Sequence, residues 1–163
     1  VSMPILDVNT DLNGTTRAAI DSGATVRSQG GAVNVIAKGD KNHASSKIKS
    51  TGGGGIVVTG LRLKANIETA TEAIVGGDII GHAGLLPGNI KIEAAGKDRA
   101  TSGMKSTGLG ALTVAASEVV ANVTSDVSAT VTGTVFSGGS LSISSTDLTD
   151  ADAGAVSLSG GGC

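Results

Sequence analysis

Pairs of acidic residues are the first feature of this 163-residue chain whose type and spacing could do chemistry. Hydrolysis of a glycan uses two carboxyl groups about 5–10 Å apart. The two candidate pairs are Glu68 with Glu72 and Glu93 with Asp98. Sugar sites usually also present aromatic platforms, but this chain has no Trp, no Tyr and only Phe136. We therefore interpret these acids as surface charge and expect no catalytic residues.

Metal binding is the second chemistry that the acidic residues suggest. Tandem calcium-binding repeats need Gly-Gly-x-Gly-x-Asp-x-apolar, and the segment Gly76-Gly77-Asp78-Ile79 matches only part of it, once. A separate acidic stretch lacks basic neighbours and contains Asp147, Asp150 and Asp152. We interpret that stretch as a solvated loop. His43 and His82 are isolated, so we expect loop residues and no zinc site, and we expect no metal or cofactor in the chain.

Basic residues alternate with apolar ones in Lys47-Ile48-Lys49 and in Arg62-Leu63-Lys64. Alternation in a strand turns both pairs of bases to the outer face. Aligned on neighbouring coils, the two pairs would form a basic ladder for an anionic glycan. The glycine run Gly52–Gly55 lacks the Lys-Ser/Thr and the helix start of a phosphate-binding loop, so we predict a turn there.

Composition and charge exclude several classes of protein. The formal net charge is −2, and residues 106–163 contain no Lys or Arg, which is unlike a nucleic-acid binder. A hydrophobic content of 39% argues against disorder. The chain has no apolar run of about 18 residues, so we expect no membrane insertion. Cys163 is the only cysteine and the last residue, which excludes an internal disulfide and suggests a handle or a chain boundary.

Internal similarity at a period of 56 residues indicates the elements that position these side chains. Residues 61–75 align with residues 117–131, and both segments alternate apolar and polar side chains. Alternation with β-branched residues predicts strands that bury one face. The competing interpretation is a helix whose apolar stripe contains Leu63, Ile67, Ala70 and Ile74. The count of alternating positions favours strands.

A second repeated block has the form Gly-x-apolar-x-apolar and occurs at residues 31–35, 88–92 and 139–143. The spacing between copies falls from 57 to 51 residues, which predicts an insertion near residues 82–87. Residues 16–20 resemble residues 70–74 more loosely. We assign clear copies of the unit to residues 56–111 and 112–163 and a partial copy to residues 1–55.

Apolar clusters near residues 56–58, 74–75 and 90–92 divide the repeated unit into three steps. A coil of about 18–19 residues, with short strands and tight corners, is typical of a β-solenoid. The predicted fold class is therefore all-β, a single-chain β-solenoid. At about 4.8 Å per coil, roughly nine coils would make a rod about 40 Å long. Its slim aliphatic interior would need no aromatic residues.

Three segments resemble the repeats of filamentous-haemagglutinin-like and leukotoxin-type filamentous adhesins, which are large bacterial exoproteins. They are Gly31–Ala37, the glycine run Gly52–Ile56 and Ala65–Val75. The resemblance covers about residues 5–160. It implies secretion, a right-handed parallel β-helix and a role in adhesion or surface display. The partners it implies are neighbouring coils or subunits of the same protein and a host-cell or glycan surface.

Together these patterns predict a non-catalytic structural or adhesive shaft segment of a secreted or surface-displayed bacterial fibre. Two alternatives remain open. One is an extracellular filament subunit that stacks end to end, because neither terminus offers a helix to cap the unpaired strand edges. The other is a β-helical enzyme that acts on polysaccharides. We expect no nucleic-acid partner.

Overall fold

The computed structural model describes residues 2–3, 5–51, 56–58, 60–108, 112–114 and 117–159. The residues Gly52–Gly55 and Cys163, discussed above, lie outside this set. Among the described residues, no helix is long and apolar enough to cross a membrane. The strands are β1 (Ser2–Met3), β2 (Leu6–Ile20), β3 (Thr25–Ser28), β4 (Val33–Thr51), β5 (Ile56–Val58), β6 (Leu61–Val75), β7 (Asp78–Gly81), β8 (Ile90–Gly108), β9 (Leu112–Val114), β10 (Ser117–Val131) and β11 (Leu141–Ser159).

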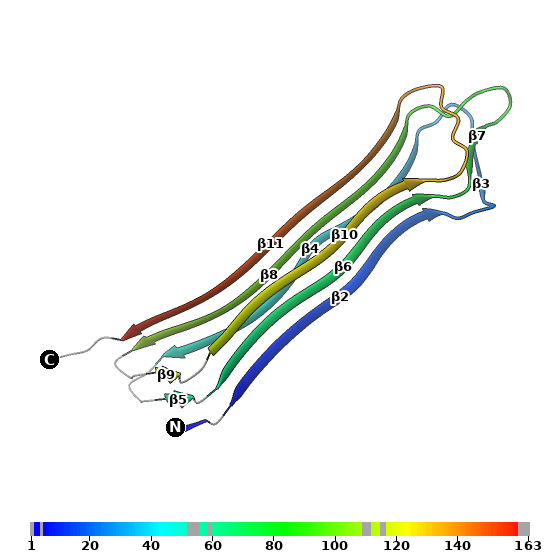
Figure 1. The fold of residues 1–163 in the computed structure, drawn as a ribbon. Helices are drawn as coiled ribbons and strands as arrows, with labels where there is room; N and C mark the ends of the chain where they lie inside the picture. Colours follow the sequence, from blue (N-terminus) through cyan, green and yellow to red (C-terminus); the bar gives the residue numbers. More distant parts are fainter. Residues whose placement is uncertain are drawn as a thin grey trace.

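All pairings between these strands are parallel, as the prediction of a β-solenoid requires. Sheet I has the order β10-β6-β2 and strands of 15 residues, and sheet II has the order β11-β8-β4 and strands of 19 residues. Small sheets at the two ends, β1-β5-β9 and β3-β7, connect them. Figure 1 shows sheets I and II side by side, curving together along their length. The all-β, stacked parallel architecture is confirmed.

One coil contains the whole repeated unit, so the predicted coil of 18–19 residues is wrong. Leu61 pairs in register with Ser117, and Leu6 pairs with Leu61. The apolar clusters taken for three coils lie in β5, at the end of β6 and at the start of β8, all in one coil. Within the described residues, glycines lie in the turns that follow β2, β3, β6, β7 and β10. Inward-facing and outward-facing side chains alternate without a break along β6 and β8, so these strands stay extended through the positions where we expected corners.

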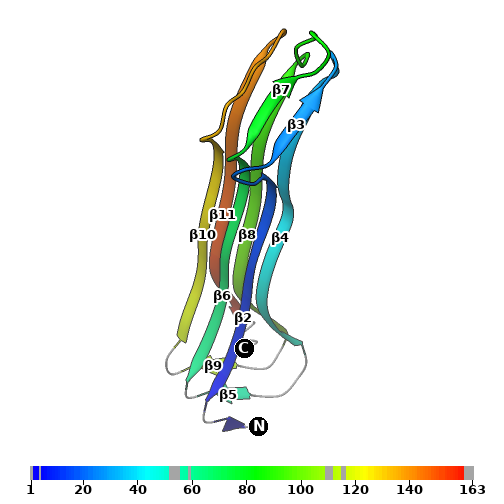
Figure 2. The ribbon, with the colours of Figure 1, turned by 90° about the vertical axis from the view of Figure 1, so that its right-hand side faces the viewer.

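The corrected coil length also changes the shape of the molecule. Coil 1 contains β1–β4, coil 2 contains β5–β8 and coil 3 contains β9–β11. Three coils rise only about 14 Å along the stacking axis, whereas a strand of 19 residues spans roughly 60 Å. The described residues therefore form a stack of three coils that is longest along its strands, instead of a rod of nine coils (Figure 2).

The alignment of repeats agrees with the register of the strands. Leu63 pairs with Val119 and Ile67 with Val123, as the sequence comparison placed them. The looser match was wrong by one position, because Thr16 pairs with Thr71. The predicted insertion forms a loop in which His82 and Leu85 make an antiparallel bridge.

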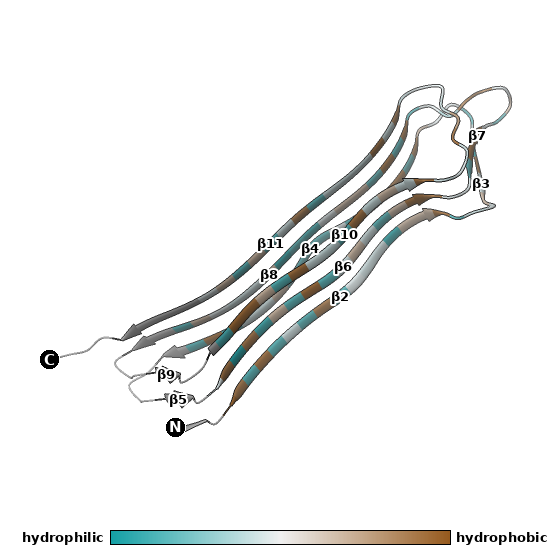
Figure 3. Cartoon of the chain, in the orientation of Figure 1, coloured by the Kyte–Doolittle hydropathy of each residue, from teal (hydrophilic) through white to brown (hydrophobic). Residues whose placement is uncertain are grey.

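Alternate side chains of each long strand point into the space between sheets I and II, which gives the banded pattern of Figure 3. The buried apolar side chains form three clusters along the strands. The first lies near β5 and includes Leu61 and Leu63, and the second, at mid-length, includes Ala65 and Ile67. The third, near β7, contains Val35, Ala37, Ala73, Val75, Ile79, Ile90, Ile92 and Ala94. Burying each large aliphatic side chain contributes roughly 1.5–3 kcal/mol.

Sheets I and II are offset by half a coil. Across the interior, β4 packs against both β2 and β6, and β8 packs against both β6 and β10. Strand β11 packs chiefly against β10. As a result Ile92 of β8 is 0% exposed, whereas its register partner Ile143 of β11 is 48% exposed.

The corner after sheet I accepts only glycine at two positions. The Gly76 amide donates to the Ile20 carbonyl at 2.7 Å, which holds coil 2 against coil 1. A Cβ atom at Gly77 would collide with the Ala24 carbonyl oxygen, and one at Gly133 would collide with Gly77. This close stacking explains why the chain has glycines at positions 76 and 77. The same two glycines are part of the segment that partly matched the calcium-binding repeat. Asp78 Oδ1 accepts the Thr134 amide at 3.2 Å in the next coil.

Candidate functional site

Neither candidate acid pair has the geometry of a glycosidase site. Glu93 lies on the outer face of β8, whereas Asp98 points to the interior and is 1% exposed. Glu68 and Glu72 share the outer face of β6, but four residues of extended strand separate their Cα atoms by about 13 Å. Side chains that stand roughly perpendicular to a sheet keep about the separation of their Cα atoms, and this separation exceeds the roughly 5–10 Å between the two carboxyl groups of a glycosidase.

Asp98 instead organises a polar belt between the second and third apolar clusters. Its Oδ1 accepts a hydrogen bond from Asn42 Nδ2 and its Oδ2 accepts one from Thr69 Oγ1, both at 2.7 Å. In coil 3, Ser125 Oγ donates to Asp147 Oδ1 at 3.2 Å. The belt links sheets I and II because Thr69 and Ser125 of sheet I donate across the interior to Asp98 and Asp147 of sheet II, while Asn42 donates from the neighbouring strand of sheet II. In the sequence, the belt is marked by polar residues at inward positions that are otherwise apolar. The sequence analysis did not recognise this pattern.

A cavity of about 110 Å³ lies beside this belt. Its lining consists of Leu12, Gly14, Thr15, Thr16, Asn42, Thr69 and Ala70. Gly14 pairs in register with Thr69, which pairs with Ser125, so coil 1 lacks the hydroxyl that coils 2 and 3 carry at this position. The cavity is polar enough for water but smaller than the sites that bind organic ligands.

The acidic stretch near the C-terminus is part of β11, so its interpretation as a solvated loop is wrong. Asp147 points to the interior, and Asp150 and Asp152 lie on the outer face, because alternate residues of a strand face opposite ways. His43 was also predicted in a loop but lies in β4. Within the described ranges, no three His, Cys, Asp or Glu side chains gather where they could hold a metal ion.

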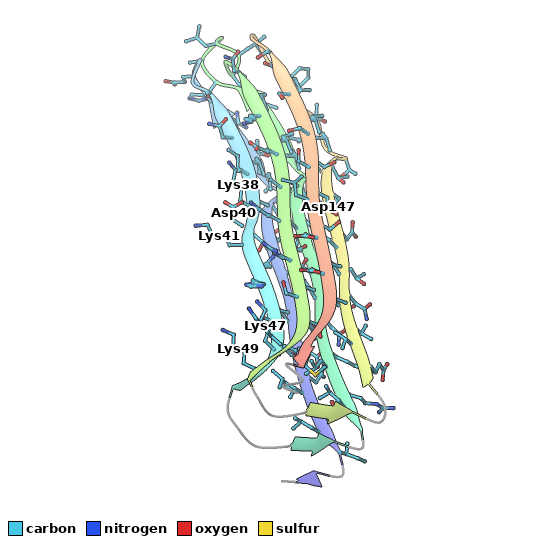
Figure 4. The ribbon with its side chains drawn as sticks, turned by 90° about the vertical axis from the view of Figure 1, so that its left-hand side faces the viewer. Lys38, Asp40, Lys41, Lys47, Lys49 and Asp147 are labelled. Carbon is cyan, nitrogen blue, oxygen red and sulfur yellow. The ribbon has the colours of Figure 1, made fainter. Side chains whose placement is uncertain are left out.

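The outer faces of the two sheets differ in charge. The outer face of sheet II carries most of the 12 Lys and Arg, namely Lys38, Lys41, Lys47, Lys49, Lys91, Lys97, Arg99 and Lys105. Figure 4 shows Lys38, Lys41, Lys47 and Lys49 projecting along β4. The outer face of sheet I carries the acids Asp7, Asp11, Glu68, Glu72, Glu118 and Asp126. Alternation alone cannot assign strands to sheets, so the sequence did not indicate this separation.

The two alternating basic segments face outward as predicted, but they lie on different sheets, so the basic ladder considered as an alternative does not form between them. Arg62 and Lys64 belong to sheet I, where Arg62 Nε lies 3.1 Å and Lys64 Nζ 3.6 Å from the carboxylate of Glu118. On sheet II, Lys49 pairs in register with Lys105. The period of 56 residues relates these two lysines and is the signal that would have found the pair.

A groove of about 500 Å³ lies around this lysine pair on sheet II. Gly103 and Gly154 are register partners within it, and a Cβ atom at Gly154 would meet nothing within 4 Å. Its other lining residues are Lys47, Ile48, Lys49, Thr101, Ser102, Met104, Lys105 and Asp152. Within the described part of the chain, no carboxylate forms an ion pair with these three lysines. The groove therefore presents the ammonium groups of three lysines beside Gly103 and Gly154, which have no side chains to fill it.

The basic residues at the other end of sheet II are neutralised. Lys91 Nζ lies 2.5 Å from Glu93 Oε2, and Lys38 Nζ lies 3.8 Å from Glu93 Oε1. The hydrogen bond from Lys91 is the main reason that the pKa of Glu93 falls below its ordinary value, with further attraction from Lys38 and Lys91 opposing partial desolvation. Among the described residues, the lysines of the groove end have no such carboxylate partner.

No protein-family model, curated protein or solved structure matches this chain. The resemblance to filamentous adhesins therefore stays a prediction. The functional conclusion below rests on the geometry and charge of the described residues.

Proposed function

We propose that this chain is a non-catalytic shaft segment of a secreted or surface-displayed bacterial fibre, wound as a right-handed β-solenoid. The hand follows from the strong preference of parallel crossovers for right-handed connections. The observation that supports a shaft is the incomplete burial of coil 3. Leu141 and Ile143 are each 48% exposed, while their partners Ile90 and Ile92 in coil 2 are buried. A stack of this kind gains stability with each added coil.

The ladders between coils suit a mechanical role. Strands β2, β6 and β10 pair residue for residue along their length, and β4, β8 and β11 do so with one irregularity between Gly39 and Asn42. Each coil is held chiefly by its neighbours, so extra coils lengthen the stack without needing a larger core. Extension and display of other parts of a fibre are the tasks that such a stack performs.

A tandem protein tests the shaft. Strand β11 ends at the end of the molecule where β2 begins, so a short Gly/Ser linker can join two copies (Figure 1). We expect the stacking dimension, measured by small-angle X-ray scattering, to grow by about 14 Å per added copy. The unfolding midpoint should also rise above that of one copy.

A junction variant provides the control for the tandem protein. Leu141→Asp with Ile143→Asp in the first copy only should remove the gain in unfolding midpoint, because charges would then face the second copy's interior. The shaft would be contradicted if the two copies scattered as separate, unstacked domains and unfolded at the same midpoint as a single copy.

Binding of an anionic polysaccharide is a second candidate function, favoured by the groove on sheet II. Lys47, Lys49 and Lys105 outnumber the single acid Asp152 around a floor that includes Gly103 and Gly154, so sulfate or carboxylate groups of a chain could approach the ammonium groups. We expect dextran sulfate to bind and neutral dextran of the same length not to bind, and salt should weaken the binding.

The two basic segments provide matched variants for this test. Lys47→Ser with Lys105→Ser should weaken dextran sulfate binding about tenfold, measured by calorimetry. Arg62→Ser with Lys64→Ser removes the same charge from sheet I, where Glu118 already pairs both residues, and should change binding little. Equal losses in the two variants would assign the binding to net charge instead of the groove.

A further inference from the structure

The two edge strands of sheet II carry opposite charges. Strand β4, at one end of the stack, contains Lys38, Lys41, Lys47 and Lys49 against a single acid, Asp40. Strand β11, at the other end, contains no basic residue and carries Asp147, Asp150 and Asp152. Figure 4 shows the lysines projecting from one edge and Asp147 on the opposite one. No described strand pairs with the outer side of either edge, so the backbone groups there are free to pair.

The apolar interior is also open at the β11 end. In coil 2, Ile90 and Ile92 pack with Ala73 and Val75 of β6, in a cluster that includes Ala18 and Ile20 of β2. Leu141 and Ile143 of β11 have no such strand beyond β10 and remain half exposed. The missing cover is a strand of sheet I. Strand β2 has the required register, because Ala18 and Ile20 pair with Ala73 and Val75.

We propose that a second copy of this chain stacks head to tail on the first, adding its β2 to β10 and its β4 to β11. The second copy's Ala18 and Ile20 then cover Leu141 and Ile143. This inference goes beyond the shaft, which requires only that coils stack within one polypeptide. The occupant is a second copy because its exposed end supplies both the apolar strand and the opposite charge.

The register of sheet II, carried on by one coil, brings the charges together. Asp152 pairs with Thr101, which pairs with Ser45, so Asp152 comes beside Ser45 of the second copy and diagonal to that copy's Lys47. Diagonal neighbours lie about 7–8 Å apart, within reach of a lysine side chain. Asp150 similarly comes beside the second copy's His43. Sheet I adds one like-charged pair, Asp7 against Glu118, but Arg62 lies 3.1 Å from Glu118 and offsets it.

The charges determine the polarity of the stack more than its strength. Exposed ion pairs are individually weak, whereas the backbone ladder and the covered apolar side chains provide the affinity. Two β11 edges repel each other chiefly through Asp152, because Asp150 lies 3.2 Å from Arg99 and Asp147 points to the interior. Two β4 edges repel each other chiefly through Lys41, Lys47 and Lys49. The head-to-tail arrangement avoids placing like-charged edges of sheet II together, and because it does not close on itself it produces a filament.

Charge reversal at the two ends tests the arrangement. Lys47→Asp places an acid diagonal to Asp152 at the junction, and Asp152→Lys places a base diagonal to Lys47; neither residue takes part in an ion pair within the described residues. We expect each variant alone to associate about fivefold more weakly than the unchanged chain, measured by sedimentation in reducing buffer. Mixing the two variants should restore association, because each then offers the charge that the other needs.

Three results would overturn the proposal. The first is an unchanged chain that stays monomeric at every concentration while the tandem protein still stacks; this result would leave the shaft intact. The second is a mixture of the two variants that associates no better than either variant alone. The third is electron microscopy showing copies joined through the outer faces of sheets I and II. Thermal unfolding of each variant, measured below the association range, should match that of the unchanged chain.

Discussion

Strands β4 and β11 occupy equivalent places in sheet II, since each is an edge strand paired on one side with β8. Their inward side chains are buried to different extents. Val35 of β4 is 7% exposed, whereas Ile143 of β11, in the same row of side chains, is 48% exposed. The difference arises across the interior, where β4 packs against two strands of sheet I and β11 chiefly against one.

The comparison shows that burial in this solenoid depends on the half-coil offset between the sheets. An edge strand can be fully part of the core if the opposite sheet extends beyond it. Strand β11 is half exposed because, among the described strands of sheet I, it packs chiefly against β10. Substitutions at matched rows should therefore differ in cost according to coil.

The largest expected effect is the difference in the free energy of unfolding between a substitution at Ile92 and the same substitution at its register partner Ile143. Ile92→Ala should lower the free energy of unfolding by about 3 kcal/mol, because it leaves a cavity in the third apolar cluster. Ile143→Ala should cost under about 1 kcal/mol, because that side chain is already half exposed. Urea unfolding of dilute, monomeric protein measures both, and equal costs would contradict the half-coil account of burial.

The polar belt gives the next comparison, between Asp98 in coil 2 and Asp147 in coil 3. Asp98→Ala should lower the free energy of unfolding by about 2 kcal/mol, because Asn42 and Thr69 would become buried donors without acceptors. Asp147→Ala should cost about 0.5 kcal/mol or less, since its partner Ser125 can turn to water. A stabilised Asp98→Ala protein would mean that burial of the carboxylate outweighs its hydrogen bonds.

A gain in stability is expected where coil 1 is incomplete. Gly14→Ser should raise the free energy of unfolding by about 0.5–1 kcal/mol, because it restricts the unfolded chain and supplies the hydroxyl missing beside Thr69. No atom within 4 Å opposes the new Cβ. Gly154→Ser on the outer face is the control and lacks a cavity to fill. A destabilised Gly14→Ser protein would show that the cavity already holds tightly bound water.

The smallest effect is on the pH dependence of stability, at Glu93, whose carboxylate lies beside Lys38 of coil 1 and Lys91 of coil 2. Because the fold lowers the pKa of Glu93 from 4.5, its ion pairs stabilise the protein above that value, and the contribution is lost as the pH falls through the folded-state pKa. Glu93→Gln should therefore flatten the loss of stability below about pH 4.5. Urea unfolding at several pH values measures this, and identical slopes in both proteins would contradict it.

The sequence predicted the strands and their pairing better than the coil. Period-two alternation in residues 61–75 and 117–131 indicated one-sided burial, and the repeat period gave the correct register, because parallel stacking places equivalent residues on top of one another. The coil length failed for a different reason. Apolar clusters mark places where the interior is filled, but they do not mark places where the chain turns.

The candidate sites were harder to predict from the sequence than the strands. Lys47 and Lys49 were predicted to face outward, but their neighbours Lys105 and Gly103 follow only from the correct coil. Glu93 and Asp98 are close in sequence, yet an odd separation along a strand puts them on opposite faces. The belt around Asp98 joins strands of both sheets, and alternation within one strand does not say which residues lie across the interior.

By itself the amino-acid order determined that strands form, that they stack in parallel and that the interior is aliphatic, since each property depends on local alternation and on repetition. Only the tertiary structure decided where the chain turns, which face gathers the lysines and which end of the stack is left open. Those features arise from the offset between two sheets, and that offset is a property of how whole coils pack.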